Sequence, residues 1–142
     1  MPLTIRAAAP EDESAVVALW RACDLVAPYN DPAADFRFAR AGAGSDILLG
    51  VDAARVVGSV MVGHDGHRGW LYYVAVAPDR RGAGIGRRMI AAAERWLSER
   101  GVPKAHLLVR ATNTGVVAFY ERLGFEVAPR VAMSKWLEPT AS

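Results

Sequence analysis

Three alternating glycines, Gly82, Gly84 and Gly86, carry the clearest chemical signal in this sequence. They follow an apolar run that ends near Val76 and open a predicted helix, and arginines stand on both sides of them. Glycines leave backbone amides uncovered by side chains, and the first turn of a helix offers unpaired N–H groups at the positive end of the helix dipole. We therefore expect an anion that carries phosphate to bind at this turn.

The spacing of these glycines disfavours the two common nucleotide-binding turns. A dinucleotide fingerprint requires G-x-G-x-x-G directly after a strand and an acidic residue about 20 positions later. Here the order is G-x-G-x-G after Pro-Asp-Arg-Arg, and residues 106–110 contain no carboxylate. A P-loop ends in G-K-[ST], whereas Gly86 is followed by Arg87 and Arg88.

Two motifs give the chain a family resemblance. The first is R-x-x-G-x-G, formed by Arg81, Gly84 and Gly86 and preceded by V-x-V-x-P. The second runs from Asn113 to Phe125 and matches the pattern N-x-x-x-x-x-F-Y-x-x-x-G-F. Together, and in this order, they resemble the GCN5-related N-acetyltransferase (GNAT) family, and the resemblance covers nearly the whole chain.

The resemblance implies a fold, a co-substrate and the residues that bind it. The fold is the GNAT fold of the α/β (α+β) class, with a mixed, mostly antiparallel central sheet flanked by helices and splayed between strands that end near Val76 and Val109. The co-substrate is acetyl-coenzyme A (acetyl-CoA), whose pantetheine enters at the splay and pairs with the backbone there. The residues implied to bind it are Val74, Ala75, Val76, Arg81, Gly82, Ala83, Gly84, Ile85, Gly86, Arg87, Asn113 and Tyr120.

Tyr120 resembles the general acid of this family, the hydroxyl that returns a proton to the departing thiolate of coenzyme A. Because Tyr120 also falls on an apolar helix face with Val116 and Leu123, an ordinary core tyrosine is the alternative. Asn113 has a structural alternative too, since asparagine is a favoured N-cap whatever the ligand.

The group that accepts the proton of the amine is not carried by these motifs. Ribosomal-protein alanine acetyltransferases, which the chain resembles from Val74 through Phe125, have a glutamate on the fifth strand where this chain has Leu108. A lysine-like amine, with a pKa of about 10.4, needs roughly 4 kcal/mol to be deprotonated at pH 7. Other polar groups must supply that help.

A loop between the first two predicted helices is one source of such groups. Asp24 and Asp31 are the candidate catalytic carboxylates, and Tyr29 and Asn30 are candidate substrate-binding residues. Two carboxylates beside an aromatic ring suit a cationic amine, although Asp31 has the alternative role of capping a helix.

The segment Asp65-Gly66-His67-Arg68-Gly69 is the second source, with Tyr73 shortly after it. His67 and Tyr73 are candidate substrate-binding residues, while Asp65-Gly66 has the alternative of ordinary turn chemistry. Both segments resemble runs in small bacterial YpeA-like acetyltransferases, which is the subfamily that the chain resembles most.

The composition predicts one compact domain over residues 1–142. The chain is 52% hydrophobic, and no Pro/Ser-rich run or shift in composition marks a linker. No apolar stretch approaches the roughly 18 residues that cross a bilayer, and the N-terminus lacks a signal-peptide pattern. The single cysteine, Cys23, suits a reducing compartment. We therefore expect a cytoplasmic protein without a membrane partner.

The distribution of charge and of metal-ligand residues argues against a nucleic-acid-binding protein and against a metalloprotein. The net charge is +2, and the 17 basic residues are spread along the chain, apart from the small group of arginines at the glycine turn. We therefore expect no nucleic acid partner. His64, His67, His106 and Cys23 show no familiar zinc spacing, so no metal is expected. If the chain self-associates, we expect a homodimer.

Hydrophobic periodicity and turn residues predict alternating elements. The first half is expected to hold a strand over 3–7, a helix opened by Pro10 that carries Val16, Leu19, Trp20 and Cys23 on one face, a short helix capped by Asp31 that carries Phe36 and Ala39, and an antiparallel meander over 47–51, 56–62 and 70–76. The second half is expected to hold a helix from the glycine turn to Gly101, a strand over 105–109, a helix from Asn113 to Gly124, a final hairpin of Val127 and 131–136, and a frayed end over 139–142.

The predicted function is acetyl-CoA-dependent N-acetylation of a primary amine, by direct transfer in a ternary complex. The acceptor is a small-molecule or protein amine, and the sequence does not separate protein N-termini, lysines, polyamines and small metabolites. The alternative is a coenzyme A-binding sensor or interaction module without turnover. Tyr120 and the polar loop of residues 24–31 favour the enzyme, whereas Leu108 favours the alternative.

Overall fold

The protein, seen in a computed structural model, is described here over residues 2–138. Its contacts separate two units, residues 1–107 and residues 108–142, and each unit is described by itself. The first unit holds the whole sheet and three α-helices, and the second holds one α-helix. A single domain over residues 1–142 stays a prediction.

The first unit is built on a five-stranded sheet whose strands follow one another in sequence order. The first four strands pair antiparallel and the fifth pairs parallel with the fourth, which confirms the predicted meander and the mixed sheet. The strands are β1 (Thr4–Ala7), β2 (Ser45–Asp52), β3 (Arg55–His64), β4 (Gly69–Val76) and β5 (Ala105–Leu107).

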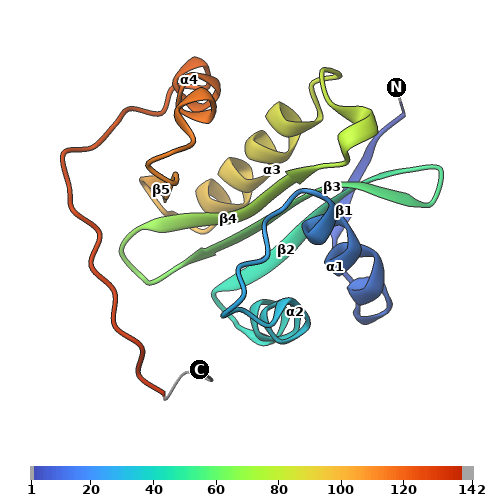
Figure 1. Ribbon diagram of the computed structural model, residues 1–142, viewed down its shortest axis with the longest axis horizontal. Coiled ribbons are helices and arrows are strands. Elements are labelled where there is room, and N and C mark those ends of the chain that lie inside the picture. The colour runs from blue at the N-terminus through green and yellow to red at the C-terminus, as the bar shows by residue number, and fades with distance from the viewer. Residues whose placement is uncertain (1, 139–142) are drawn as a thin grey trace. The chain divides into compact units, whose positions relative to one another are not determined.

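Helices cover both faces of this sheet (Figure 1). A 3-10 turn (Pro10–Asp12) leads into α1 (Glu13–Ala22), and α1 lies with α2 (Pro32–Ala41) on one face. The longest helix, α3 (Ile85–Glu99), lies on the other face, where a Cβ atom added at Gly58 of β3 would meet Ile85 at 2.9 Å. Glycine in the strand therefore lets α3 approach the sheet backbone closely.

The ends of α2 and α3 follow from local side-chain and backbone chemistry. Asp31 accepts a hydrogen bond from the Ala34 amide at 3.1 Å, so it is the predicted N-cap of α2. Helix α3 ends before Gly101, which adopts a φ of +76°, and the Val102 amide donates to the Leu97 carbonyl at 3.0 Å. A left-handed glycine just past the helix with this backward bond is a Schellman-type stop, as the sequence predicts.

The side chains that α3 buries are the predicted ones together with one more. Ile85, Met89, Ala93, Trp96 and Leu97 recur every three or four residues and are all buried, and Ile90 joins them. On α1, Val16, Leu19 and Trp20 are buried as predicted, whereas Cys23 lies just past the helix end and is half-buried. On α2, Phe36 and Ala39 are buried as predicted. The core of the first unit therefore lies between the sheet and these three helices.

Strands β4 and β5 pair over only three residues. The register runs from Gly69 opposite Ala105 to Leu71 opposite Leu107, and β5 ends there instead of continuing to Val109. Beyond Leu71, β4 runs on to Val76 with no strand on that side within the described part of the first unit. The splay that the family resemblance implies therefore starts after Leu71.

The second unit contains α4 (Thr114–Arg122), which ends before Gly124 at a φ of +94° as predicted. The predicted final hairpin is wrong, because no strand is formed between residues 124 and 138. The Arg130 amide donates to the Ala128 carbonyl at 2.8 Å, so the chain turns at Pro129, but the runs on either side do not pair. Alternating apolar residues favour a strand, but a strand forms only when another strand is available to pair with it. The predicted frayed end, residues 139–142, lies outside the described residues.

Candidate active site

The glycine turn of residues 81–84 leaves a cluster of backbone amides without partners inside α3. Gly84 is the N-cap of α3 and has no side chain to cap it, and the first helical bond runs from the Arg88 amide to the Gly84 carbonyl at 3.2 Å. The amides of Ile85, Gly86 and Arg87 therefore have no acceptor within the helix. Gly82 and Gly84 both adopt left-handed φ angles, 84° and 80°, and a Cβ atom at either position would meet nothing within 4 Å. The turn thus presents amides to open space at a positive helix end.

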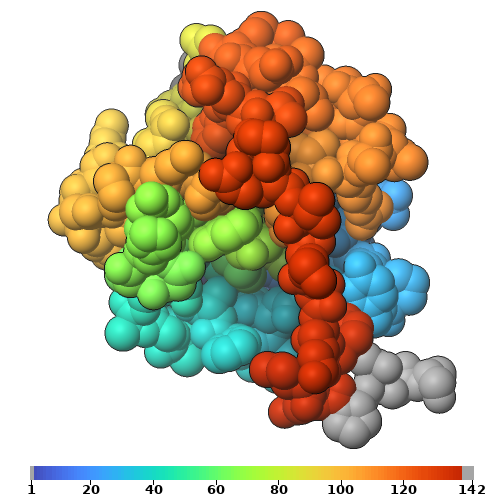
Figure 2. All heavy atoms as spheres, turned by 90° about the vertical axis from the view of Figure 1, so that its left-hand side faces the viewer, coloured from blue at the N-terminus to red at the C-terminus, as the bar shows by residue number. Residues whose placement is uncertain are grey.

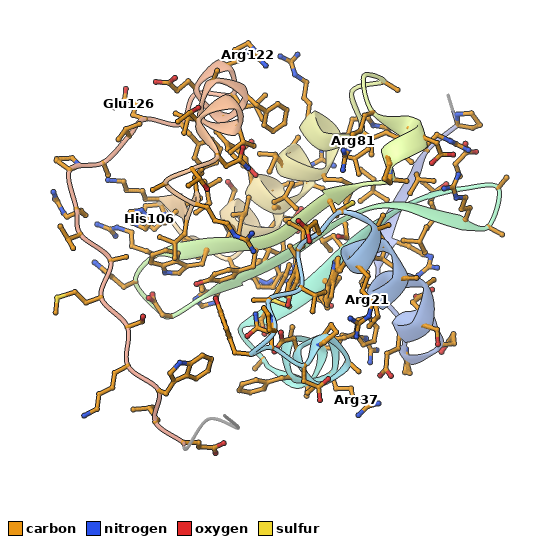
Figure 3. All side chains as sticks on the ribbon, in the orientation of Figure 1. Arg21, Arg37, Arg81, His106, Arg122 and Glu126 are labelled. Atoms are coloured by element: carbon orange, nitrogen blue, oxygen red, sulfur yellow. The ribbon has the colours of Figure 1, made fainter. Side chains whose placement is uncertain are left out.

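The four arginines around this turn divide into two pairs. Arg80 donates to Asp52 at 2.6 Å, and Arg88 donates to the Leu3 carbonyl at 3.2 Å, so both help to hold the turn. Arg81 and Arg87 are exposed, and neither side chain has a hydrogen bond or ion pair among the described residues. Figure 3 shows Arg81 at the turn before α3. Arg81 and Arg87 are thus the two cations of the group that are available to an anion.

The last residues of β4 present backbone groups to the splay. The Ala77 amide donates to the Val57 carbonyl of β3 at 2.8 Å. Because neighbouring residues of an antiparallel strand point their N–H and C=O groups to opposite sides, Val76 and Val74 point theirs away from β3. The Val76 carbonyl accepts a hydrogen bond from the Cys23 thiol at 3.2 Å, which is a weak donor. An extended ligand could pair with this edge as another strand would.

Tyr73 occupies a bulge in the middle of β4. The β3–β4 register shifts between Ser59, opposite Ala75, and Met61, opposite Tyr72, and Tyr73 adopts a φ of +49°. A left-handed conformation costs a residue with a side chain about 1–3 kcal/mol, so the surrounding contacts must hold it in place.

Those contacts form a chain of stacked and hydrogen-bonded groups. The Trp20 ring stacks on the Tyr73 ring with centroids 3.8 Å apart, and its Nε1 donates to Ser59 Oγ at 3.0 Å. Ser59 is fully buried and its Oγ donates to the Tyr73 carbonyl at 2.8 Å. The Tyr73 hydroxyl donates to Asp35 Oδ2 of α2 at 2.8 Å. Burial and the Asp35 carboxylate raise the pKa of Tyr73, and a hydrogen bond with Asn30 opposes that shift.

The loop of residues 23–31 brings only part of the predicted acceptor set together. The Asn30 side chain forms a hydrogen bond with the Tyr73 hydroxyl, so these two predicted residues are in contact. One carboxylate oxygen of Asp31 accepts the hydrogen bond that caps α2. Asp24 is exposed and adopts a φ of +56°, and the Tyr29 side chain is 67% exposed. Both carboxylates remain on the surface of the loop.

The turn that carries His67 lies at the opposite end of β4 from the glycine turn (Figure 1). Asp65 Oδ1 accepts hydrogen bonds from the His67 amide at 2.9 Å and from the Arg68 amide at 2.8 Å. These two backbone amides lower the pKa of Asp65. Figure 2 shows the turn in green, projecting beside the cyan connection from α2 to β2, where the His64 amide donates to the Gly44 carbonyl at 2.9 Å. Asp65 therefore performs the turn chemistry that was its structural alternative.

Tyr120 and Asn113 belong to the second unit. The Tyr120 ring makes edge contacts with Phe119 and Phe125, with centroids 5.1 and 5.7 Å apart, and burial raises the pKa of its hydroxyl. Asn113 is the N-cap residue of α4 by position, but its side chain makes no capping hydrogen bond. Leu108 follows directly after β5 and is 60% exposed. Because the Asn113 side chain does not cap α4, its carboxamide is not used by its own helix.

Two of the three histidines lie beside aromatic rings. The His64 ring lies 6.2 Å from Trp96 and the His106 ring lies 5.0 Å from Trp70, centroid to centroid. Within the described residues no three His, Cys, Asp or Glu side chains could together hold a metal ion. Among residues 2–138, no helix is both long enough and apolar enough to cross a membrane.

Comparison with known proteins decides the family. The model of the acetyltransferase (GNAT) family matches residues 14–125. The chain belongs to the GNAT family. A bacterial relative, an acetyltransferase of Pectobacterium atrosepticum, is 41% identical to this GNAT chain over 136 residues, which cover 95% of this chain and 96% of the relative.

Solved structures agree with the GNAT assignment. A Trypanosoma brucei acetyltransferase superposes with a TM-score of 0.75 at 25% identity, covering 95% of this chain and all of that one. The enzyme AAC(6′)-Iy, solved with a bisubstrate analogue of coenzyme A and acetylneamine, superposes with a TM-score of 0.82 at 18% identity, covering 96% of this chain and 99% of its own. At that identity the second likeness shows the GNAT fold alone.

One polar residue that contacts the predicted Tyr73 was missed from the sequence. Asp35 lies four residues after Asp31 on α2 and was not among the candidates, although that spacing places both on one helix face. The missing information was which side chain of α2 lies within reach of a side chain from β4. Only the fold shows that Asp35 does, through the Tyr73 hydroxyl.

Proposed function

We propose that this GNAT chain is an acetyl-CoA-dependent N-acetyltransferase that transfers the acetyl group directly to a primary amine in a ternary complex. The observation that carries the proposal is the set of free amides at the start of α3. This set follows the part of β4 beyond Leu71, whose edge away from β3 pairs with no strand of the described first unit. The amides suit a pyrophosphate, and the strand edge suits the amide groups of a pantetheine arm.

The proposed acetyl-CoA contacts follow the geometry of the first unit. The amides of the turn from Gly82 to Arg87 receive the pyrophosphate, and Arg81 and Arg87 supply positive charge. The backbone groups of Val74 and Val76 hold the pantetheine, with Ala75 between them paired to β3. The proposal adds Asn113 from the second unit as a further contact, supported by its side chain having no capping bond.

Tyr120 is the proposed general acid. The departing thiolate must take up a proton, and a tyrosine hydroxyl is protonated at neutral pH and can supply it. The proposal places the acceptor amine beside the loop of residues 24–31. There Asp24 and Asp31 attract the amine, Tyr29 and Asn30 contact it, and Tyr73 and His67 extend the site.

The test is release of free thiol from acetyl-CoA across a panel of primary amines: spermidine, lysine- and alanine-terminated peptides, and an aminoglycoside. The proposal expects at least one amine to give thiol and acetylated product in equal amounts. A covalent acetyl-enzyme formed without acceptor would contradict direct transfer. Mass spectrometry of the protein after incubation with acetyl-CoA alone detects it.

A coenzyme A-binding module without turnover is the second candidate. Leu108 favours it, because an exposed leucine directly after β5 provides no proton acceptor. Tight binding of acetyl-CoA in calorimetry, with no amine in the panel acetylated, would favour this candidate over the enzyme.

A further inference from the structure

Asp35 is a carboxylate without a cation beside the bulge of β4. Its Oδ2 accepts a hydrogen bond from the Tyr73 hydroxyl, and no arginine, lysine or histidine pairs with it among residues 2–138. In the first unit four other carboxylates, those of Asp12, Glu13, Asp52 and Asp79, each hold an arginine. Asp35 therefore keeps one oxygen and its negative charge for another partner.

Three contacts support the two elements that meet at this carboxylate. The Tyr73 ring is stacked on the fully buried Trp20, and its backbone is held by Ser59. Helix α2, which carries Asp35, is tied to α1 by Arg37, whose Nε donates to Glu13 at 2.7 Å (Figure 3). The Tyr73–Asp35 bond thus joins two supported elements, and the free oxygen has a defined place.

The carboxylate lies one tyrosine side chain away from the strand edge proposed to hold the thioester. Tyr73, whose hydroxyl contacts Asp35, directly precedes Val74, and the Val74 backbone faces away from β3. Asp24 and Asp31, to which the proposed function gives the amine, are less well placed, since Asp24 is exposed and Asp31 caps α2; the inference moves that role to Asp35. Among the described residues, Asp35 is the only charged group that acts on the bulge residue Tyr73. A cation between the Asp35 carboxylate and the β4 edge would be attracted to that charge.

We infer that Asp35 binds the ammonium group of a cationic primary-amine acceptor and takes a proton from its nitrogen as the amide forms, with Tyr73 as the residue that positions it. This inference rests on the proposed function. The ammonium first loses one proton to water. The nitrogen lone pair then forms the C–N bond, and the C–S bond breaks with its electron pair on sulfur.

The remaining protons balance the transfer. The nitrogen, now positively charged, passes its second proton to Asp35, which later gives it to solvent. The thiolate takes a proton from Tyr120, whose hydroxyl is restored from water. The sum is ammonium and acetyl-CoA giving the N-acetyl amine, free coenzyme A and one proton.

The test measures steady-state kinetics of four variants with the best amine of the panel. In Asp35→Asn the acceptor KM rises about 10- to 100-fold, the usual loss for a charged hydrogen-bonding partner. The wild-type KM rises with added salt, and the Asp35→Asn value does so much less. Tyr73→Phe gives a smaller rise, because the carboxylate remains but is less well held. Glu94→Gln, which removes one exposed charge from α3, leaves all constants unchanged. In each variant the acetyl-CoA affinity and the melting temperature are the same as in the wild type.

The fourth variant, Asp24→Asn combined with Asp31→Asn, separates the two acceptor sites. If this double variant loses acceptor affinity and Asp35→Asn does not, the inference is wrong and the loop holds the amine. Wild-type kinetics in Asp35→Asn also overturn it. Binding of acetyl-CoA without acetylation of any cationic amine overturns the inference but keeps the co-substrate assignment, whereas absence of acetyl-CoA binding overturns the proposed function as well.

Discussion

Replacing Gly84 by valine tests the co-substrate site, and the chain offers a matched control for it. Gly84 stands just before α3 and Gly101 just after it, with φ angles of 80° and 76°, and a Cβ atom at either would meet nothing within 4 Å. Valine therefore imposes the same kind of backbone strain at both ends of one helix. Only at Gly84 does the new side chain enter the space in front of the free amides.

The two variants are expected to share one effect and to differ in another. A left-handed conformation costs a residue with a Cβ about 1–2 kcal/mol, so the free energy of unfolding should fall by a similar amount in both. At Gly84 the isopropyl group also keeps a pyrophosphate from the amides. Losing two charge-assisted hydrogen bonds of about 1.5–3 kcal/mol each raises the acetyl-CoA Kd by about 10²- to 10⁴-fold.

Isothermal titration calorimetry with acetyl-CoA measures this difference, after urea unfolding has shown that both variants are folded. Gly101→Val should bind as the wild type does. If folded Gly84→Val binds within threefold of Gly101→Val, the phosphates do not lie at the glycine turn and the reasoning from its open amides fails.

Three further outcomes are expected. Tyr120→Phe should lower turnover by about 10²-fold with acetyl-CoA affinity and melting temperature unchanged, and wild-type turnover would make the tyrosine structural. Arg80→Met should lower the free energy of unfolding by about 1–2 kcal/mol in urea titrations, because it leaves the half-buried Asp52 carboxylate unpaired; an unchanged midpoint would contradict this. Arg55 lowers the pKa of Asp79 to about 2, so the ionised carboxylate stabilises the fold above about pH 4 and this contribution is lost as the pH falls towards 2. The difference in melting temperature between wild type and Asp79→Asn should shrink over that range, and a constant difference would argue against the ion pair.

Elements whose signals are local were predictable from the sequence. The apolar spacing of α3, its stop at Gly101 and the Asp31 cap of α2 are all properties of a few neighbouring residues, and all three are confirmed. The final hairpin was wrong because a strand needs a partner, which alternation within residues 131–136 does not specify. Strand β5 likewise ends at Leu107, two residues before its predicted end.

The two halves of the candidate site differ in the same way. The co-substrate half depends on backbone groups at glycines, so the residue types themselves reveal it. The acceptor half depends on which side chain of α2 reaches the bulge of β4. Bulges come from register shifts between strands, and nothing in the Tyr72-Tyr73 pair indicates that Tyr73 turns to left-handed φ and meets Asp35.

The orientation of the glycine turn is set by a strained hairpin that precedes it in the chain. The β2–β3 turn places Ala53 and Ala54 at φ angles of 49° and 68°, where alanine costs about 1–2 kcal/mol each and Asn-Gly would be usual. This two-residue turn sets Asp52 opposite Arg55.

Each of these two residues then pairs with one member of the Pro78–Arg80 segment. Asp52 accepts from Arg80 at 2.6 Å, and Arg55 donates to Asp79 at 2.8 Å. A longer and less strained loop would separate the two charges and lose one of the crossed pairs. Since that segment leads directly into Arg81, the two ion pairs help to hold the start of the proposed phosphate site and offset part of the strain in the two alanines.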